Sequence, residues 1–325
     1  MTPMDRDWGL GIRDSGCGAR DSGLWAQDSG STRLAVTLAI LLLLVTMLTA
    51  SAQPQHAPTR IVSLVPSVTE TLFAMGAGSR VAAVSSYDMF PPEVEHLPRV
   101  GALFDPDVER ILSLRPDLVI VYGSQTDLMA RLQRASIPMY VYRHGSLADV
   151  ATSIRDVGDR IGMADAARAL AATIDRALTG IRTRVRNAPR PRTMLVIGRE
   201  PGSLRAINVS GGFGFLHDLL ELAGGANVFG EVKRESMLVS TETILARKPD
   251  VILELHYSEP PMPGELARER AVWDPLSAVP AVKAGRVYLL YGGELVVPGP
   301  RIVDTALTFA RALHPDLAPW GKRYH

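Results

Sequence analysis

The sequence is almost without cysteine, since Cys17 is the single one among 325 residues. No disulfide can form within the chain, and a cysteine-based metal site is excluded with it. An excess of one charge is missing too, because 35 basic side chains balance 34 acidic ones and leave a formal net charge of +1. No basic stretch is interleaved with aromatic residues, so nucleic-acid binding is not expected.

Common catalytic signatures are also missing. The chain contains neither the G-x-S-x-G nucleophile elbow nor a phosphate-binding P-loop. The stretch SGGFGF at 210–215 is rich in glycine but lacks the G-x-G-x-x-G spacing of a dinucleotide-binding turn. We therefore expect a binding protein rather than an enzyme, without a cofactor of its own.

The N-terminal region holds one long apolar run. LAVTLAILLLLVTMLTASAQ begins at residue 34 and ends in Ala50-Ser51-Ala52 before Gln53. This pattern predicts a secretory signal peptide over 34–52 and hence an exported, periplasmic protein. An uncleaved membrane anchor is the alternative, although the apolar core is short for a span of about 20 residues. Residues 1–33 carry mixed charge and a repeated Asp-Ser-Gly, and form an atypical extension.

Short apolar runs alternate with segments of helical spacing in the rest of the chain, which is the pattern of strand–helix–strand units and parallel sheets. The run from Asp165 to Asn187 predicts one long helix of about 20 residues, or ~30 Å. The predicted fold is therefore α/β, with two βα lobes that each hold a parallel-rich sheet and are joined by one long, rigid helix. The predicted boundaries are 59–146 for the N-terminal lobe (N-lobe), 147–188 for the helical linker and 192–316 for the C-terminal lobe (C-lobe).

One sequence pattern occurs twice. VERILSLRPDLVIV starts at residue 108, and TETILARKPDVILEL starts at residue 241. The same offset of 133 residues separates Glu109 from Glu242 and Asp117 from Asp250. Pro-Asp commonly ends helices, and a glutamate in the first turn favours the helix dipole. The matching spacing indicates the same helix-to-strand element in each lobe.

Several segments, taken in order, resemble the periplasmic cobalamin-binding proteins of ABC importers. They are RIVSLVPSVTETLFAMGAGSRVAAVSSYDMFPPEVEHLPRVG, VERILSLRPDLVIV, GGANVFGEV, VSTETILARKPDVIL and VPGPRIVDTAL. The resemblance extends from about Arg60 to Pro315 and includes the broader group that carries haem, ferric siderophores and corrinoids. It implies two α/β lobes bridged by a helix that limits hinge bending, with the ligand in the cleft between them.

The resemblance also assigns a partner. In that group one glutamate on each lobe docks into an arginine pocket on a permease subunit, and by motif position these are Glu109 and Glu242. Two identical permease subunits present the same patch twice, so a single-chain partner needs two similar carboxylates. We expect a monomer that meets an ABC permease dimer and touches the membrane only through it, or through an uncleaved signal.

The resemblance implies a pocket for a flat macrocycle, cobalamin or another corrinoid. The candidate ligand contacts lie at strand ends and the following loops, where open α/β sheets bind ligands. They are Tyr87, Phe104 and Tyr122 in the N-lobe and Gly211, Gly212, Phe213, Tyr257 and Glu294 in the C-lobe. Leu103 stands where the cobalamin group offers an aromatic residue, and Gly292-Gly293-Glu294 replaces an Asp-aromatic pair, so haem or a ferric siderophore stays open as the ligand.

Two histidines follow equivalent strands, His144 in the N-lobe and His256 in the C-lobe. Either could supply an axial ligand to a metal or a haem iron. The sequence holds no H-x-H pattern that would indicate a metal site of the protein's own.

Overall fold

The computed structural model describes residues 57–258, 260–317 and 319–320. The N-terminal extension, the expected signal peptide and Cys17 lie outside these residues. Within the described part of the chain, no helix combines the length and the apolar character needed to cross a membrane.

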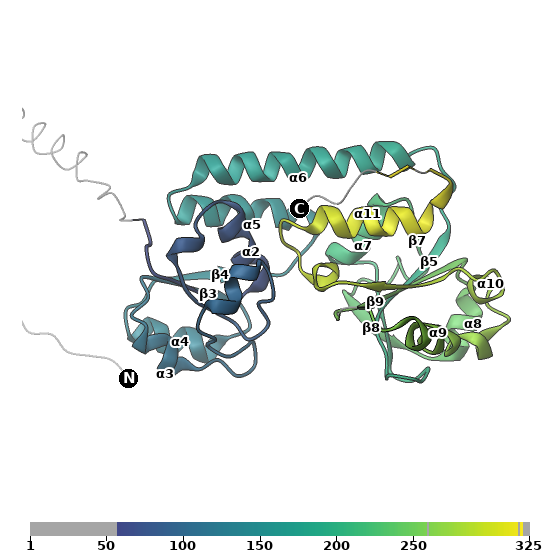
Figure 1. Cartoon of the computed structure of the whole chain (residues 1–325), viewed down its shortest axis with the longest axis horizontal. Coiled ribbons are helices and arrows are strands. Elements are labelled where there is room, and N and C mark those ends of the chain that lie inside the picture. The colour runs from purple at the N-terminus through teal and green to yellow at the C-terminus, as the bar shows by residue number, and fades with distance from the viewer. Residues whose placement is uncertain (1–56, 259, 318, 321–325) are drawn as a thin grey trace, which may run out of the picture. The chain divides into compact units, whose positions relative to one another are not determined.

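The N-lobe is built on a four-stranded parallel sheet, with the strand order β2-β1-β3-β4. Its side chains are buried on both faces, as in most parallel sheets covered by helices. Figure 1 shows this lobe in purple and blue. Its strands are β1 (Ile61–Ser63), β2 (Val81–Val84), β3 (Leu118–Tyr122) and β4 (Met139–Tyr142), and its helices are α2 (Pro66–Ala74), α3 (Val108–Ser113) and α4 (Thr126–Arg134).

The C-lobe holds a six-stranded sheet of mixed direction. Strands β10, β9 and β5 pair in parallel, whereas β6 and β8 continue the sheet in the antiparallel sense. The sequence did not reveal β6 and β8, because polar residues interrupt both short strands and β8 lies at the edge with Ser236 and Leu238 exposed. The strands are β5 (Arg192–Gly198), β6 (Ile207–Ser210), β7 (Ala226–Asn227), β8 (Ser236–Val239), β9 (Val251–His256) and β10 (Val287–Tyr291).

Helices surround this second sheet. They are α7 (Phe215–Leu222), α8 (Thr241–Arg247), α9 (Pro263–Ala271), α10 (Pro280–Lys283) and α11 (Ile302–Leu313). Short 3-10 helices complete the chain at η1 (Gly78–Arg80), η2 (Pro92–His96), η3 (Asp274–Leu276), η4 (Gly293–Val296) and η5 (Pro315–Leu317).

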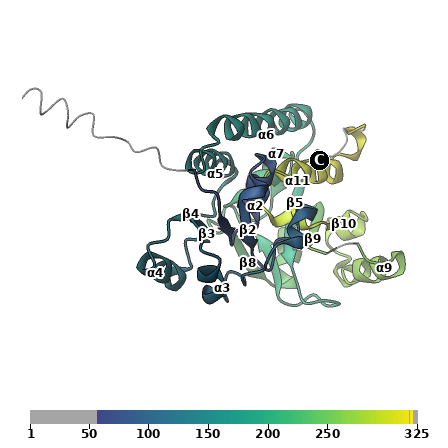
Figure 2. The ribbon, with the colours of Figure 1, turned by 60° about the vertical axis from the view of Figure 1, so that its left-hand side comes forward.

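A layer of helices joins the two lobes. The predicted long helix is present as α6 (Ala164–Val185), whose 22 residues span about 33 Å at the usual helical rise. It is preceded by α5 (Leu147–Arg160). Helix α6 contacts α5, α7 and α11, and Figures 1 and 2 show it running over both lobes. Buried side chains recur along one of its faces, at Ala167, Ala171, Ile174, Leu178, Ile181 and Val185. The predicted two-lobe α/β fold with a helical backbone is confirmed.

The repeated sequence pattern has the same backbone structure in both lobes. Glu109 and Glu242 are the second residues of α3 and α8, and both are exposed. A residue of left-handed conformation follows each helix, Arg115 at φ 48° after α3 and Lys248 at φ 49° after α8. The buried Ile111 and Ile244 anchor the two helices and are both 0% exposed.

The repeated aspartates tie each helix-to-strand turn to the start of a neighbouring strand. Asp117 accepts hydrogen bonds from the backbone N–H groups of Thr59 (2.7 Å) and Arg60 (2.9 Å), just before β1. Asp250 accepts one from the N–H of Arg192 (3.1 Å), at the start of β5. The Pro-Asp repeat is therefore explained by the fold.

Candidate functional site

The N-lobe brings its candidate residues to one edge of the sheet. Tyr87, Tyr122 and His144 lie at or just after the ends of β2, β3 and β4, and parallel strands end at the same edge. Tyr87 is 68% exposed. Tyr122 is half-buried, and its ring meets the edge of Tyr142 with centroids 5.8 Å apart. Burial raises the pKa of Tyr122, so its hydroxyl stays protonated as a hydrogen-bond donor.

Phe104 stands on a loop that is tied to the same edge. Its side chain is 91% exposed. The buried Gln125 donates from Nε2 to the carbonyl of Leu103 (3.1 Å) and accepts from the N–H of Tyr122 (3.0 Å). One side chain therefore fixes the loop of Phe104 relative to Tyr122.

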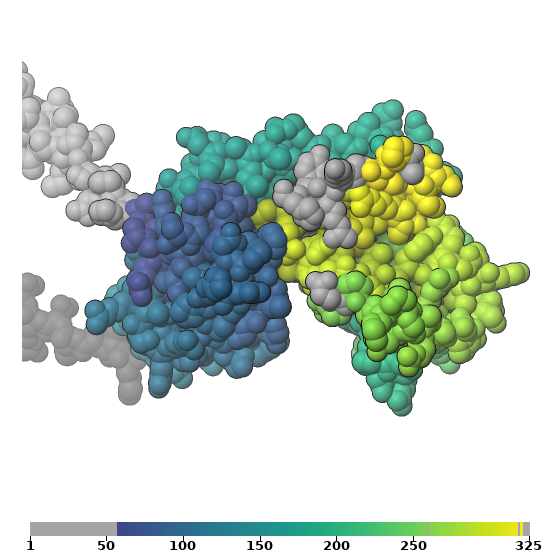
Figure 3. Space-filling model, viewed as in Figure 1, coloured from purple at the N-terminus to yellow at the C-terminus, as the bar shows by residue number. Residues whose placement is uncertain are grey.

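A pocket of about 350 Å³ lies between the lobes and brings three candidates together. His144 reaches it from the N-lobe, and Phe213 and Tyr257 reach it from the C-lobe. Phe213 and Tyr257 are each about half exposed, at 51% and 53%. The ring of His144 meets the edge of Phe215, at the start of α7, with centroids 5.3 Å apart. Figure 3 shows the hollow that opens between the N-lobe in blue and the C-lobe in green. Tyr87, Phe104 and Tyr122 do not line this pocket.

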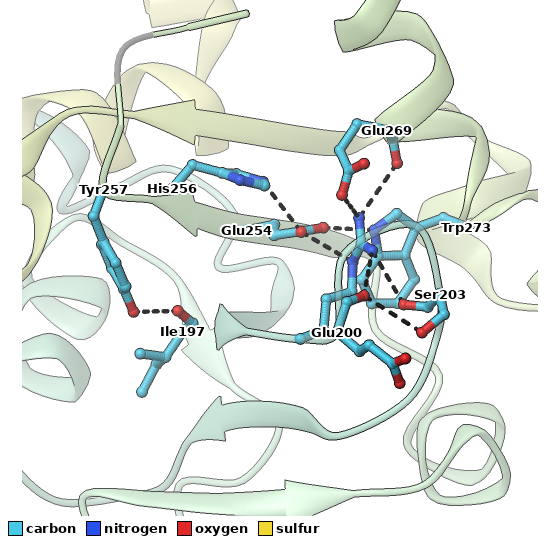
Figure 4. Close-up of polar contacts among 9 residues, drawn as sticks. Ile197, Glu200, Ser203, Glu254, His256, Tyr257, Glu269 and Trp273 are labelled. Atoms are coloured by element: carbon cyan, nitrogen blue, oxygen red, sulfur yellow. Dashed lines mark hydrogen bonds and ion pairs between the residues drawn. The ribbon is translucent and has the colours of Figure 1, made fainter.

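Tyr257 separates this pocket from a second one in the C-lobe. Its hydroxyl donates to the carbonyl of Ile197, and burial raises the pKa of its phenol. Figure 4 shows the ring pointing away from His256 toward that carbonyl. Tyr257 and Ile197 line both pockets, and the second has a volume of about 640 Å³. The two pockets are therefore neighbours along one wall of the cleft.

The second pocket is built on a buried ionic network around Arg199, and Figure 4 labels its partners Glu254, Glu269 and Trp273. The Nε of Arg199 lies 3.0 Å from Glu254, and its Nη2 donates to Glu269 (2.6 Å). Trp273 donates from its indole nitrogen to the other oxygen of Glu254 (2.7 Å). The side chains of Arg199 and Glu254 are each only 2% exposed. Burial acts to raise the pKa of Glu254, but His256, Arg199 and Trp273 outweigh it and lower that pKa, so the carboxylate is ionised.

His256 is part of this network. Its Nε2 lies 3.1 Å from Glu254, and its ring stacks on Tyr291 with centroids 4.5 Å apart. An axial role for His256 would need either its Nδ1 or the opening of this contact, whereas His144 lines the pocket between the lobes. Axial ligation by either stays a prediction. No group of three or more histidine, cysteine, aspartate or glutamate side chains in the described part of the chain is arranged to hold a metal ion.

Gly211 and Gly212 allow close backbone packing. The N–H of Gly211 donates to the carbonyl of Glu235 (3.1 Å), and that of Gly212 donates to the carbonyl of Val232 (2.7 Å). A Cβ at Gly212 would lie 1.9 Å from the carbonyl oxygen of Gly230. The fold therefore explains both glycines without a ligand, and their predicted contact with one stays a prediction.

Glu294 lies at the junction of the two lobes. Its side chain is 10% exposed, and one oxygen lies 3.5 Å from Nη1 of Arg301. The same arginine binds Glu70 of the N-lobe. This burial does not favour the predicted ligand contact of Glu294, which stays untested.

The sequence did not reveal the Arg199 network. One signal was present, since Glu254 interrupts the otherwise apolar strand VILELH. A charged residue inside such a strand requires a buried partner. The partner, Arg199, lies 55 positions earlier in the chain, and nothing local in the sequence connects the two residues.

Comparison with known proteins agrees with this architecture. The sequence profile of the family described as "Periplasmic binding protein" matches residues 61–292. A "Vitamin B12-binding protein" of Yersinia pseudotuberculosis serotype O:1b is 29% identical over 217 residues, which cover 66% of this chain and 75% of that protein.

Solved structures show the same fold. The periplasmic vitamin B12 binding protein BtuF of Vibrio cholerae aligns with a TM-score of 0.68 at 26% identity, covering 80% of this chain and 98% of that one. The periplasmic heme-binding protein RhuT from Roseiflexus sp. RS-1 aligns with a TM-score of 0.65 at 26% identity, covering 78% and 98%. The chain is thus similar both to a protein named for vitamin B12 and to one named for haem.

Proposed function

This chain belongs to the family of periplasmic binding proteins, and we propose that it captures cobalamin or a related corrinoid after export and delivers it to an ABC-type permease. The observation that carries the proposal is the pocket between the lobes, with the rings of His144, Phe213 and Tyr257 on its walls. Aromatic rings on facing walls suit a flat macrocycle. The similarity to vitamin B12-binding proteins supports a corrinoid as that macrocycle.

Haem or a ferric siderophore is the second candidate ligand. The similarity to a haem-binding protein supports it. His144 supports haem in particular, because its imidazole reaches the pocket and histidine is a common ligand of haem iron.

Delivery would use the two exposed glutamates of the repeat. Glu109 and Glu242 occupy the same place on corresponding helices, one in each lobe. Charged residues at such a contact set orientation and encounter rate more than raw affinity. A side-chain hydrogen bond with Ser240 lowers the pKa of Glu242, which keeps this carboxylate ionised for an arginine partner.

Titration of the purified protein starting at Gln53 with cyanocobalamin, and in parallel with haem, tests the ligand. Tight one-to-one binding of cyanocobalamin supports the proposal. Binding of haem with a shift of its absorbance, and none of cyanocobalamin, would move the assignment to the second candidate. N-terminal sequencing of the exported protein tests export itself. A start at Gln53 supports a released binding protein, whereas an intact apolar run would favour a membrane-anchored sensor with the same lobes.

A further inference from the structure

The C-lobe wall of the cleft carries more carboxylates than cations. The neighbouring pockets of about 350 and 640 Å³ contain four glutamates among their described lining residues, against one arginine and two histidines. The glutamates are Glu235, Glu254, Glu265 and Glu269.

The single arginine of this wall is already neutralised. Arg199 contacts both Glu254 (3.0 Å) and Glu269 (2.6 Å), so two carboxylates face one guanidinium. Its Nη1 donates to the carbonyl of Ser203 (3.1 Å), and its side chain is only 2% exposed. The guanidinium is therefore closed off from a ligand in the cleft.

The remaining negative charge of the pockets comes from three glutamates, of which Glu269 shares Arg199 with Glu254. Glu235 and Glu265 are exposed, and the side chain of Glu269 is 27% exposed at the edge of the network. Arg143, Lys233 and Arg234 adjoin the wall in sequence but line neither pocket. A carboxylate on a bound ligand would thus meet like charges with no available guanidinium, whereas an amide could donate hydrogen bonds to them.

We propose that Glu235, Glu265 and Glu269 form an acidic wall that selects ligands with neutral, amide-bearing peripheries and rejects those with carboxylate-bearing ones. This inference rests on the proposed function and refines it. Corrinoids such as cobalamin carry peripheral amides, whereas haem carries two propionates. The wall would thus separate the two candidate ligands by charge, although both are flat macrocycles of similar shape.

Cyanocobalamin and its monocarboxylic acid, in which one peripheral amide is a carboxylate, form the matched ligand pair for the test. At low ionic strength we expect the amide form to bind about tenfold more tightly, with the ratio shrinking as salt is added. The variant E235Q/E265Q/E269Q should bring the ratio close to one. The variant E235Q/E265Q leaves the Arg199 network intact and should give an intermediate ratio even if the triple variant does not fold. Glu200→Gln, in the exposed pair with Arg205, is the control and should leave the ratio unchanged.

An equal affinity of the wild-type protein for both corrinoids would overturn the inference while leaving the proposed function intact. A preference that persists unchanged in the glutamine variants would do the same. If neither corrinoid binds, the corrinoid proposal fails, and haem against its dimethyl ester becomes the matched pair. The acidic wall then predicts tighter binding of the ester, and equal binding of the two porphyrins would refute it.

Discussion

Arg301 of the C-lobe holds Glu70 of the N-lobe in a two-pronged ion pair, with nitrogen–oxygen distances of 2.6 and 3.0 Å. Glu70 lies on α2, and Arg301 immediately precedes α11. The guanidinium also stacks on the ring of Phe90 (4.0 Å to the centroid). Because the side chain of Glu70 is 4% exposed, this pair joins the two lobes away from bulk solvent.

Substitution of Arg301 should lower the free energy of unfolding more than substitution of Glu70. In the Arg301→Gln variant, Glu70 and Glu294 stay buried without the cation, and we expect a loss of about 3 kcal/mol in the free energy of unfolding. Glu70→Gln should cost less, because Arg301 keeps Glu294 as a partner. Chemical denaturation at neutral pH measures both values.

An exposed ion pair gives the control for this comparison. The side chains of Arg205 and Glu200 are 76% and 45% exposed, and Arg205→Gln should cost less than about 1 kcal/mol. Equal losses of unfolding free energy in Arg301→Gln and Arg205→Gln would show that the ion pair between Arg301 and Glu70 does not stabilise the fold.

Transfer to the permease should depend on the repeated glutamates. The double substitution of Glu109 and Glu242 by alanine should abolish uptake by permease-containing proteoliposomes and leave the ligand affinity unchanged, because both side chains are exposed on α3 and α8. Each single substitution should reduce uptake partially. Glu95→Ala, at another exposed site, is the control and should transport normally. A loss of ligand affinity in the double variant would mean that these residues belong to the pocket instead.

The lobes and the bridging helix could be predicted because their signals are local. Apolar runs of four or more residues marked the parallel strands, and the regular spacing in 165–187 marked α6 to within about two residues at each end. The antiparallel strands β6 and β8 could not be found in the same way. Polar residues interrupt their short sequences, INVS and SMLV, which match turns equally well.

The sequence predicted that the candidate site residues lie at strand ends, but not which side chains they contact. Its residues were placed at strand ends, and parallel strands do bring Tyr87, Tyr122 and His144 to one edge. The sequence could not show that Glu294 is held at the lobe junction. Its partner Arg301 also binds Glu70, and 231 positions separate Arg301 from Glu70 in the chain. Buried charge networks join distant segments, so their members are visible only in the folded chain.

The repeated aspartates should contribute unequally to stability. Asp117 accepts from two backbone N–H groups and the hydroxyl of Thr59, whereas Asp250 accepts from the N–H of Arg192. We expect about 2 kcal/mol of lost stability for Asp117→Ala, and less for Asp250→Ala. Burial acts to raise the pKa of Asp117, but the hydrogen bonds from Thr59 and Arg60 outweigh it and lower that pKa. The contribution of the Asp117 carboxylate to the free energy of unfolding is thus complete above the ordinary aspartate pKa and is lost as the pH falls through the lowered value.

Denaturation of the wild-type protein and the Asp117→Ala variant at pH 7 and near pH 2.5 checks this dependence. The difference in unfolding free energy should shrink at the lower pH, because the pH then lies below the ordinary aspartate pKa and falls toward the lowered pKa of Asp117. A difference that is the same at both values would contradict the role of the ionised carboxylate.

Ionisation of the buried Asp88 carboxyl should destabilise the native state as the pH rises. This side chain is 0% exposed; its Oδ2 accepts from the N–H of Ser85 (2.8 Å), and its Oδ1 has no hydrogen-bond partner. Burial raises the pKa of Asp88 above the ordinary value of 3.8, so the native state keeps a proton that the unfolded chain has already lost. The stability benefit of that proton is complete below the ordinary pKa and is lost as the pH rises through the raised value.

The Asp88→Asn variant stays neutral at every pH and retains an oxygen for the contact with Ser85. Relative to the wild-type protein, we expect it to gain about 1 kcal/mol of stability between pH 4 and pH 7. Asp175→Asn, at an exposed position of α6, should show no such gain and is the control. Parallel pH profiles for the wild-type protein and Asp88→Asn would contradict a raised pKa of Asp88 in the native state.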